Sequence, residues 1–424
     1  MKVGWIGLGR LGLPCALVLA DRGHEVVGFD VVEAVGNAVE LADPIKLPYV
    51  EPGVEDLLKR AAVGAIEFRV ETSIREVVRA SEVVFVAVQT PHAPEYDGTK
   101  PVPEQTRDFE YGYLIQAVRE VARAARDLNR EIVLVVVSTV LPGTINRLIR
   151  PLLNTRVALV YSPQFIAMGT TIRDFTNPEF LLLGTEHPEA AANVADVFDP
   201  VHAAAPVLCT IADAEMAKVA YNTFISMKIA WANHLGALCD ATGADADRVV
   251  DVLAQATQRV ASPAYLRPGM GDGGACHPRD LIAMAGLELR AGLPLFFGGL
   301  AQLRDQQTAA LAELVLRWAD QTKLDVCLLG LAYKPGVPLM DGSPALLLKH
   351  YLGPPSAGRS IEASDPGGPR NAPTLTRKKV YVISTNHPQY HHLRFPSGSV
   401  VIDPWGDVEI EPGSGVVLVR PGRR

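Results

Sequence analysis

One cysteine in this 424-residue sequence lies among glycines and is followed directly by charged residues, in the segment GMGDGGACHPRD at 269–280. Glycines allow close approach to the backbone, and consecutive N–H groups stabilise negative charge. These surroundings suit a reactive thiolate, so we predict that Cys276 is a nucleophile. Asp280 follows four residues later, where it could relay a proton or position water. Alternatively, it is the N-cap of the next helix.

A second set of polar residues recurs along a long, otherwise apolar segment that starts near Ala212. Lys218 and Asn222 are four residues apart and therefore share one face of a helix. Ser226 and Asn233 extend the same polar stripe. Polar groups on a buried helix need partners, which a salt bridge and an inter-helix hydrogen bond would supply. We favour a functional role, in which Lys218 and Asn222 polarise a substrate oxygen as charge develops on it.

The N-terminal segment GLGRLG has the spacing G-x-G-x-x-G, after a predicted strand and at the start of a predicted helix. Gly7 allows a tight turn, Gly9 admits a pyrophosphate, and Gly12 allows the helix to pack on the strand. Asp30 ends the next strand, where its carboxylate would bind a ribose 2′-hydroxyl and repel a 2′-phosphate. The pattern therefore predicts a site for NAD rather than NADP. The other residues that we assign to this site are Leu11, Thr90 and Thr139.

Apolar strands alternate with helical segments around the glycine-rich turn. Further strands are predicted at 82–88, 131–139 and 157–162, and each is apolar throughout. Strands of this kind form parallel sheets that helices cover on both faces. The helix from about 212 is apolar almost all round, which places it in a large core or in a subunit interface.

A second alternation of strands and helices follows in the C-terminal part of the chain. Strands are predicted at 323–333, 378–385 and 399–406, and the Pro/Gly-rich segment 353–379 is expected to be a loop around one short strand. The histidines of HPQYHH are also assigned to a loop rather than to a metal site, because no other ligands converge on them. They are His387, His391 and His392.

The composition excludes several classes of protein. Hydrophobic residues make up 48% and charged residues 21% of the chain, as in ordinary globular proteins. The net charge of −7 argues against nucleic acid or an anionic membrane as the main partner. The remaining cysteines have no C-x-x-C pair, which fits inert thiols in a reducing compartment better than disulfides or zinc; they are Cys15, Cys209, Cys239 and Cys327. We find no targeting or spanning segment and expect a cytoplasmic protein.

Together these motifs resemble those of the nucleotide-sugar 6-dehydrogenases, the UDP-glucose and GDP-mannose dehydrogenase family, in the same order and over nearly the whole chain. WIGLGRLGLP matches the family's opening, STVLPGT at 138–144 its S-T-V-x-x-G-T stretch, and SPQFIAMGTTIRDF at 162–175 its N-P-E-F-L-x-x-G loop. KVAYNTF at 218–224 matches K-x-x-x-N on the central helix, and GLAYKPGVP at 330–338 resembles the G-x-x-F-K-P start of the C-terminal domain. The most specific match is GDGGACHPRD with G-F-G-G-x-C-x-P-K-D.

The resemblance implies that an alcohol is oxidised to an aldehyde and then to an acid with two NAD+. An aldehyde gives up a hydride only after a nucleophile has added to it, so Cys276 would form a thiohemiacetal and then a thioester that water cleaves. The resemblance also assigns polarisation of the sugar oxygen to Lys218 and Asn222, and the ordering of a water near the nicotinamide to Thr139. In the simplest case UDP-glucose becomes UDP-glucuronate, in a homodimer formed through the central helix.

For the substrate, the resemblance implies contacts from three parts of the chain. Arg259 would reach the diphosphate or the sugar from the partner subunit, and Lys334 would bind the diphosphate. Tyr265 and Leu266 would lie beside the nucleotide. The remaining substrate-binding residues are Phe165, Ile166, Lys218, Asn222, Gly269 and Gly273. For the charged and aromatic members of this set, the alternative is a solvated charge or a surface aromatic.

Three departures from the family pattern bear on this function. Gln164 occupies the position of a glutamate that helps to hydrolyse the thioester, and an amide cannot take up a proton. Asp341, in PLMDGS, occupies the position of an arginine that contacts the cofactor or the adjoining loop. The connection after 365–366 is shorter than usual. Two alternatives therefore stay open: a single-step NAD-dependent hydroxyacid or sugar dehydrogenase, and a catalytically weakened nucleotide-sugar-binding protein.

We therefore predict an α/β fold with two Rossmann-like, doubly wound parallel-sheet domains, joined by a long central helix and a helical middle domain. The NAD-binding domain is expected at 1–209 and the helical domain of dimerisation and substrate binding at 210–310. The C-terminal, nucleotide-sugar-binding domain is expected at 311–424.

Overall fold

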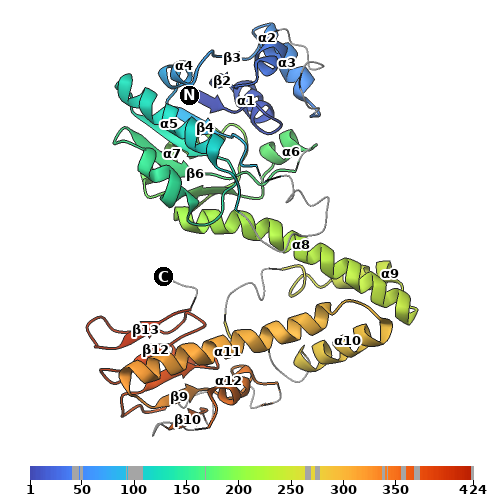
Figure 1. The fold of residues 1–424 in the computed structure, drawn as a ribbon, viewed down its shortest axis with the longest axis vertical. Helices are drawn as coiled ribbons and strands as arrows, with labels where there is room; N and C mark the ends of the chain where they lie inside the picture. Colours follow the sequence, from blue (N-terminus) through green and yellow to red (C-terminus); the bar gives the residue numbers. More distant parts are fainter. Residues whose placement is uncertain are drawn as a thin grey trace. The chain divides into compact units, whose positions relative to one another are not determined.

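In the computed structural model, the chain forms two compact units, Met1–Met227 and Lys228–Arg424 (Figure 1). Each unit contains one β-sheet with helices packed on it, so the expected α/β class is confirmed. The described residues are 1–40, 47, 51–91, 93, 108–167, 169–262, 269–272, 277–336, 340, 342–354, 360–366 and 373–421.

The first unit is built on an eight-stranded sheet with the order β3-β2-β1-β4-β5-β6-β7-β8. The strands are β1 (Lys2–Ile6), β2 (Glu25–Phe29), β3 (Phe68–Val70), β4 (Val83–Val86), β5 (Ile132–Val136), β6 (Val157–Tyr161), β7 (Leu181–Gly184) and β8 (Pro206–Cys209). Strand β1 lies between β2 and β4, and both pairs are parallel. The strand order therefore reverses at β1, and in open α/β sheets such a reversal marks the crevice where ligands bind.

The first sheet is parallel, as expected, except for one pair of strands. Strand β7 pairs with β6 in the antiparallel sense, with Tyr161 opposite Gly184, and β8 is parallel to β7. Strands β3, β7 and β8 were not predicted, because they are only three or four residues long and lack an alternating pattern. Strands β7 and β8 thus run antiparallel to the other strands, and antiparallel strands at the margin of an otherwise parallel sheet are common.

Helices cover both faces of this sheet, as the continuous apolar strands predicted. One core includes side chains from α1 (Gly12–Asp21), α2 (Glu33–Glu40), α3 (Val54–Ala62), α6 (Thr171–Thr176) and α7 (Pro188–Phe198). The other includes α4 (Ile74–Ala80), α5 (Gly112–Asp127) and the short helix η3 (Ile145–Ile149), which is followed by η4 (Arg150–Leu152). Buried apolar side chains on both faces are the source of the stability of such a sheet.

The second unit carries a five-stranded parallel sheet with the order β10-β9-β11-β12-β13. Its strands are β9 (Val326–Leu329), β10 (Ile361–Ser364), β11 (Val380–Ile383), β12 (Val400–Ile402) and β13 (Val417–Val419). The short strand expected within 353–379 is β10, whereas β13 was not predicted. The helices of this unit are α9 (Ala246–Ala254), α10 (His277–Ala291), α11 (Phe296–Thr322) and α12 (Pro344–Leu352), and Pro388–Tyr390 forms the short helix η5.

The long helix expected from residue 212 is α8 (Ile211–Thr242). It is not buried on all sides within this chain, because Met216, Phe224, Ile225 and Met227 are 41–54% exposed. The prediction that α8 is buried in a large core is therefore wrong. The alternative, that α8 lies in a subunit interface, stays a prediction.

Candidate functional site

The glycine-rich turn between β1 and α1 has the geometry that its sequence predicted. Gly7 has a φ of +91°, which other residues rarely adopt, and a Cβ on Gly12 would lie 1.8 Å from the carbonyl oxygen of Gly7. A Cβ on Gly9, in contrast, would meet no atom within 4 Å. Gly7 and Gly12 are therefore required by the fold itself, whereas Gly9 leaves open the space that a pyrophosphate would need.

We expect alanine at these two positions to have opposite consequences. Gly12→Ala should destabilise the first unit by more than about 4 kcal/mol, because the clash is with backbone that cannot move away. Gly9→Ala should leave the unfolding temperature unchanged but weaken NAD binding about tenfold or more, because the methyl group fills the pyrophosphate space. Thermal unfolding and NADH fluorescence titration separate the two effects. Normal NADH binding by a folded Gly9→Ala variant would contradict the assignment.

Asp30 lies directly after β2 and binds the glycine-rich turn itself. One carboxylate oxygen accepts from the backbone N–H of Leu8 at 2.7 Å, and the other accepts from Val32 at 2.8 Å. Each oxygen keeps a second acceptor site, so the carboxylate can also receive ribose hydroxyls. The residues of the chain therefore fit the adenosine side of NAD, and Asp30 also holds the turn in place.

The ends of β4 and β5 are joined by hydroxyl groups. Thr90 donates to the carbonyl oxygen of Thr139 at 2.7 Å, and Ser138 donates to that of Val88 at 2.6 Å. Thr90 and Thr139 therefore lie next to each other, as expected for two residues of one site. The structure gives Thr90 and Ser138 a role in satisfying local backbone groups, and contacts of Thr90 or Thr139 with the cofactor stay a prediction.

Lys218 is one of the few buried charged residues among the described residues of the first unit. It is only 7% exposed, and its Nζ donates to the backbone carbonyl oxygen of Gln164 at 2.8 Å and lies 4.8 Å from the ring centre of Phe165. Burial lowers the pKa of the Lys218 ammonium, and no acidic group among the described residues contributes to this shift. The salt bridge that would explain Lys218 structurally is therefore not found within the described part of the chain.

Lys218 and Asn222 line one cavity of about 400 Å³, which also includes Gln164, Phe165 and Ile166. The cavity thus brings together five of the residues that we assigned to the site, two from α8 and three from the loop before α6. Phe165 packs edge-on against Phe180 and Tyr221, with ring centres 4.8 and 4.9 Å apart. An aromatic wall beside a buried ammonium group suits a ligand with both polar and apolar surface, such as a sugar ring.

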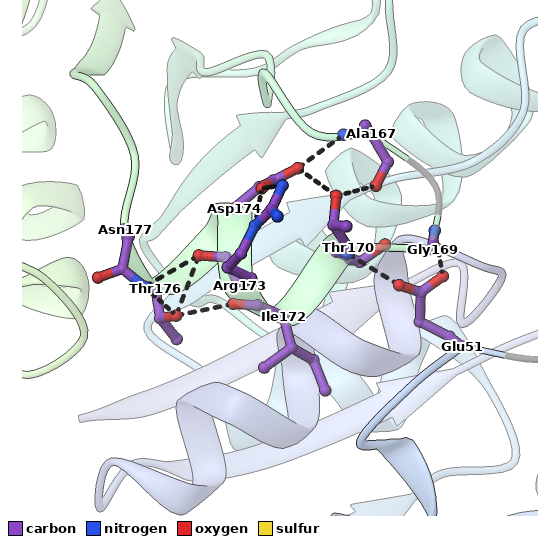
Figure 2. A network of polar contacts seen from close by, with 10 residues as sticks. Glu51, Ala167, Gly169, Thr170, Ile172, Arg173, Asp174, Thr176 and Asn177 are labelled. Atoms are coloured by element: carbon purple, nitrogen blue, oxygen red, sulfur yellow. Dashed lines mark hydrogen bonds and ion pairs between the residues drawn. The ribbon is translucent and has the colours of Figure 1, made fainter.

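The loop that forms one wall of this cavity is held by two carboxylates (Figure 2). Glu51 accepts from the backbone N–H groups of Gly169 and Thr171, and Asp174 accepts from the backbone of Ala167 and the hydroxyl of Thr170. The hydroxyl of Thr170 lowers the pKa of Asp174 more than its other partners do. Sequence reasoning missed Glu51, because its partners are 118 and 120 residues away in the chain.

Glu215, one turn before Lys218 on α8, is a fully buried carboxylate that the sequence analysis also missed. It accepts from the backbone N–H groups of Gly143 and Ile145 at 2.6 and 2.7 Å. The segment 138–144, which carries Thr139, is thereby fixed to the helix that carries Lys218. No local signal in the sequence marks this role of Glu215, because its two partners are 72 and 70 residues away in the chain.

We expect Glu215→Gln to lower the free energy of unfolding of the first unit by about 2–3 kcal/mol. A carboxylate can accept both hydrogen bonds, whereas an amide presents N–H groups to one of the two donors. Glu186→Gln is a suitable control, because Glu186 is paired with Arg150 at the surface, where ion pairs contribute little. Calorimetry of both variants measures the difference. Equal unfolding temperatures for the two variants would contradict this role.

The side chain of Gln164 donates to the carbonyl oxygen of Ser162 at 3.3 Å. The amide at this position therefore contacts the backbone of its own loop, and it offers no proton acceptor comparable to a carboxylate.

Several predicted site residues lie outside the described residues: Cys276, Tyr265, Leu266, Gly273 and Asp341. Asp280 falls in the first turn of α10, which begins at His277, so the alternative that Asp280 is the N-cap is wrong. Arg259 and Lys334 are exposed, and Lys334 lies 5.3 Å from the ring centre of Tyr333. Gly269 packs against the indole of Trp405, which a Cβ would meet at 2.7 Å.

The remaining cysteines are poor candidates for a nucleophile. Burial raises the pKa of Cys15, Cys209 and Cys327, in the last case to about 11, and Cys239 is buried. The histidines of HPQYHH have separate partners: His387 faces Asp365, His391 faces Asn386, and His392 faces Glu409.

No helix among the described residues is both long and apolar enough to cross a membrane.

The fold and the glycine-rich turn define a Rossmann-type α/β protein that binds NAD. A family model described as the NAD binding domain of the UDP-glucose/GDP-mannose dehydrogenase family matches residues 1–202, and the central-domain model of that family matches residues 212–302. The chain belongs to the UDP-glucose/GDP-mannose dehydrogenase family.

Individual relatives agree with this assignment. The chain is 31% identical to a GDP-mannose 6-dehydrogenase of Pseudomonas putida, over 83% of this chain and 78% of the relative. It is 29% identical to a UDP-glucose 6-dehydrogenase of Rhizobium meliloti, over 96% and 90% of the two chains. Among solved structures, a ternary complex of GDP-mannose dehydrogenase from Pseudomonas aeruginosa superimposes with a TM-score of 0.84 at 25% identity and covers 99% of both chains.

Proposed function

We propose that this chain oxidises the C6 hydroxyl of a nucleotide sugar to a carboxylate, in two NAD-dependent steps. The observation that carries the proposal is Lys218, a buried ammonium group without a carboxylate partner among the described residues, which lines a cavity together with Asn222. Burying such a charge costs stability, and a substrate oxygen that becomes negative would offset that cost. The cavity lies in the unit that carries the glycine-rich turn.

In the first oxidation, Lys218 and Asn222 stabilise the charge that develops on O6 as the hydroxyl proton leaves. Bound NAD+ accepts one hydride in each of the two oxidations. The thiolate of Cys276 then adds to the aldehyde carbon, and the thiohemiacetal loses its hydride to become a thioester. Water cleaves the thioester, which releases the acid and regenerates the thiol. Because Gln164 cannot act as a base, Asp280 or another group must activate this water.

Two nucleotide sugars are the leading candidates for the substrate. The sequence motifs were read most simply as those of a UDP-glucose dehydrogenase. Relatives named GDP-mannose 6-dehydrogenase are 30–32% identical to this chain, and the structural relative with a TM-score of 0.84 is named GDP-mannose dehydrogenase. We infer that GDP-mannose is the first substrate to test and UDP-glucose the second. Arg259, Lys334 and the segment around Tyr265 are the proposed nucleotide contacts.

The test is a panel of nucleotide sugars incubated with NAD+, in which NADH is measured by absorbance and the product by mass. Two NADH for each sugar and a gain of 14 mass units, from CH2OH to COOH, would support the proposal. One NADH for each sugar would favour the single-step dehydrogenase. Tight binding of a nucleotide sugar without NADH would favour the catalytically weakened binding protein. The homodimer through α8, with its exposed Met216 and Phe224, is tested separately by light scattering.

A further inference from the structure

Glu51 is a buried carboxylate far in sequence from every residue that we assigned to the site. Its side chain is 7% exposed, and both its oxygens accept from the backbone of one loop, from Thr171 at 2.8 Å and from Gly169 at 3.0 Å. No cation among the described residues forms an ion pair with it. Among the described residues, the partners of this carboxylate are the two backbone N–H groups, so its position and that of the loop depend on each other.

The loop that Glu51 holds is the one that lines the candidate cavity. Asp174 closes the same loop from its other side, by accepting from Ala167 at 3.1 Å and from the hydroxyl of Thr170 at 2.7 Å, as Figure 2 shows. The residues directly before Ala167 are Phe165 and Ile166, which line the cavity. A displacement of Gly169 would therefore also move Ile166 and Phe165 in the cavity wall, which are three and four residues away.

The same loop also fixes Lys218. The ammonium group donates to the carbonyl oxygen of Gln164 and lies over the ring of Phe165, so its hydrogen bond and its cation–π contact are both made with this loop. Glu51 has no contact with Lys218 itself among the described residues. It acts on the ammonium group through the backbone that runs from Gly169 back to Gln164.

Glu51 also lies near the helix that the glycine-rich turn opens. The pKa of Cys15, on α1, is raised by burial and further by the charge of Glu51, which places that charge close to α1. Helix α6, which Thr171 begins, packs on α1 as well, and Ile172 lies 3.0 Å from where a Cβ on Gly53 would be. Glu51 therefore lies next to the place where α6 packs on α1, while both its side-chain hydrogen bonds are made to the loop of the cavity.

We propose that Glu51 is a positioning residue for the sugar-binding cavity. It fixes Gly169 and Thr171 and, through the loop that carries Gln164 and Phe165, positions the ammonium group of Lys218. This inference rests on the proposed function, because it takes the cavity to be the place where the nucleotide sugar is oxidised. Glu51 touches no substrate atom in this account. Instead, Glu51 holds the loop in the geometry of the bound state before the substrate binds, which favours binding and catalysis.

The test compares Glu51→Gln with Glu55→Gln, an equal change at an exposed carboxylate four residues away on α3. An amide can accept from only one of the two N–H groups that Glu51 binds. We expect Glu51→Gln to raise the KM for GDP-mannose, or for the sugar that the panel identifies, about tenfold and to lower kcat about tenfold. The KM for NAD+ should change by less than about twofold, because the glycine-rich turn and Asp30 are intact. Glu55→Gln should match the wild type in all three values.

Hydrogen–deuterium exchange of the peptide 163–177 gives a readout that does not depend on activity. Loss of the carboxylate should make the amides of Gly169 and Thr171 exchange about tenfold faster. If Glu51→Gln proves too unstable, Asp174→Asn is the second variant, because Asp174 is near the surface and holds the same loop. It should move the KM for the sugar in the same direction.

The possible outcomes separate the inference from the proposed function. Faster exchange with an unchanged KM for the sugar and an unchanged kcat would show that Glu51 only stabilises the fold, and would overturn the inference. An equal rise in the KM for NAD+ would overturn it too. If the wild type oxidises no nucleotide sugar in the panel, the proposed function fails, and the exchange experiment then reports only on the loop.

Discussion

Replacing Lys218 with methionine is expected to lower kcat about a thousandfold while the protein stays folded. The ammonium group is the charged donor that stabilises the developing oxyanion in our proposal, and methionine keeps its length without its charge. The fold should tolerate the change, because Lys218 is buried beside Phe165 and no carboxylate of the described residues depends on it. The KM for NAD+ should be unchanged, since the glycine-rich turn is not altered.

Initial rates of NADH formation test this prediction, with Lys59→Met as the control. Lys59 is an exposed lysine of the same unit, paired with Glu55 on the surface of α3. Its loss should leave kcat at the wild-type value. A Lys218→Met enzyme that keeps more than about a tenth of the wild-type kcat would show that this ammonium group does not carry the oxyanion.

The same variant also tests the pKa of Lys218. Burial lowers the folded-state pKa below the value of about 10.4 that lysine has in the unfolded chain. Between these two values the unfolded chain binds more protons, so the free energy of unfolding rises with pH. Below the folded-state pKa the penalty for the buried charge is present in full. Wild type should therefore gain stability relative to Lys218→Met as the pH rises toward about 10.4, which urea unfolding at several alkaline pH values can measure.

The sequence was most informative where function demands a fixed local pattern. Gly7, Gly9, Gly12 and Asp30 lie within one β-α-β unit, so their spacing alone predicted the turn that the structure contains. Lys218 and Asn222 were assigned to one helix face for the same reason, and both line the cavity. In each case the residues that act together are near in sequence, and the periodicity of a helix or strand fixes their relative directions.

The sequence was least informative where long-range contacts decide the structure. Glu51 and Glu215 bind backbone N–H groups 70 to 120 residues away, and a carboxylate in such a role has no local signature. The antiparallel pairing of β7 with β6 was missed because a strand of four residues carries no sign of its direction. The sequence does not show that one apolar side of α8 is exposed within this chain. Hydrophobic residues indicate that a surface is covered by a partner, but not whether the same chain or another one supplies that partner.

The second prediction with a large effect concerns Cys276, whose role rests on the sequence signature. Replacing Cys276 with serine should reduce formation of the acid by at least about a thousandfold, because a hydroxyl group at neutral pH is a far weaker nucleophile than a thiolate. The first oxidation does not need the thiol, so the variant should still release about one NADH for each active site before it stops. Single-turnover absorbance and the mass of the bound product measure both quantities.

Cys209→Ser is the matched control for this variant. Cys209 is half-buried in the first unit, and its thiol donates weakly to the carbonyl oxygen of Leu183, which a serine hydroxyl can also do. Burial raises the pKa of Cys209, so its thiol is not a nucleophile at neutral pH, and the control should keep two NADH for each sugar. Two NADH for each sugar from Cys276→Ser as well would rule out the thioester route, because no covalent intermediate would then be needed to make the aldehyde a hydride donor. If Cys276→Ser stops after one NADH with an aldehyde bound, the result supports Cys276 as the nucleophile of the second oxidation.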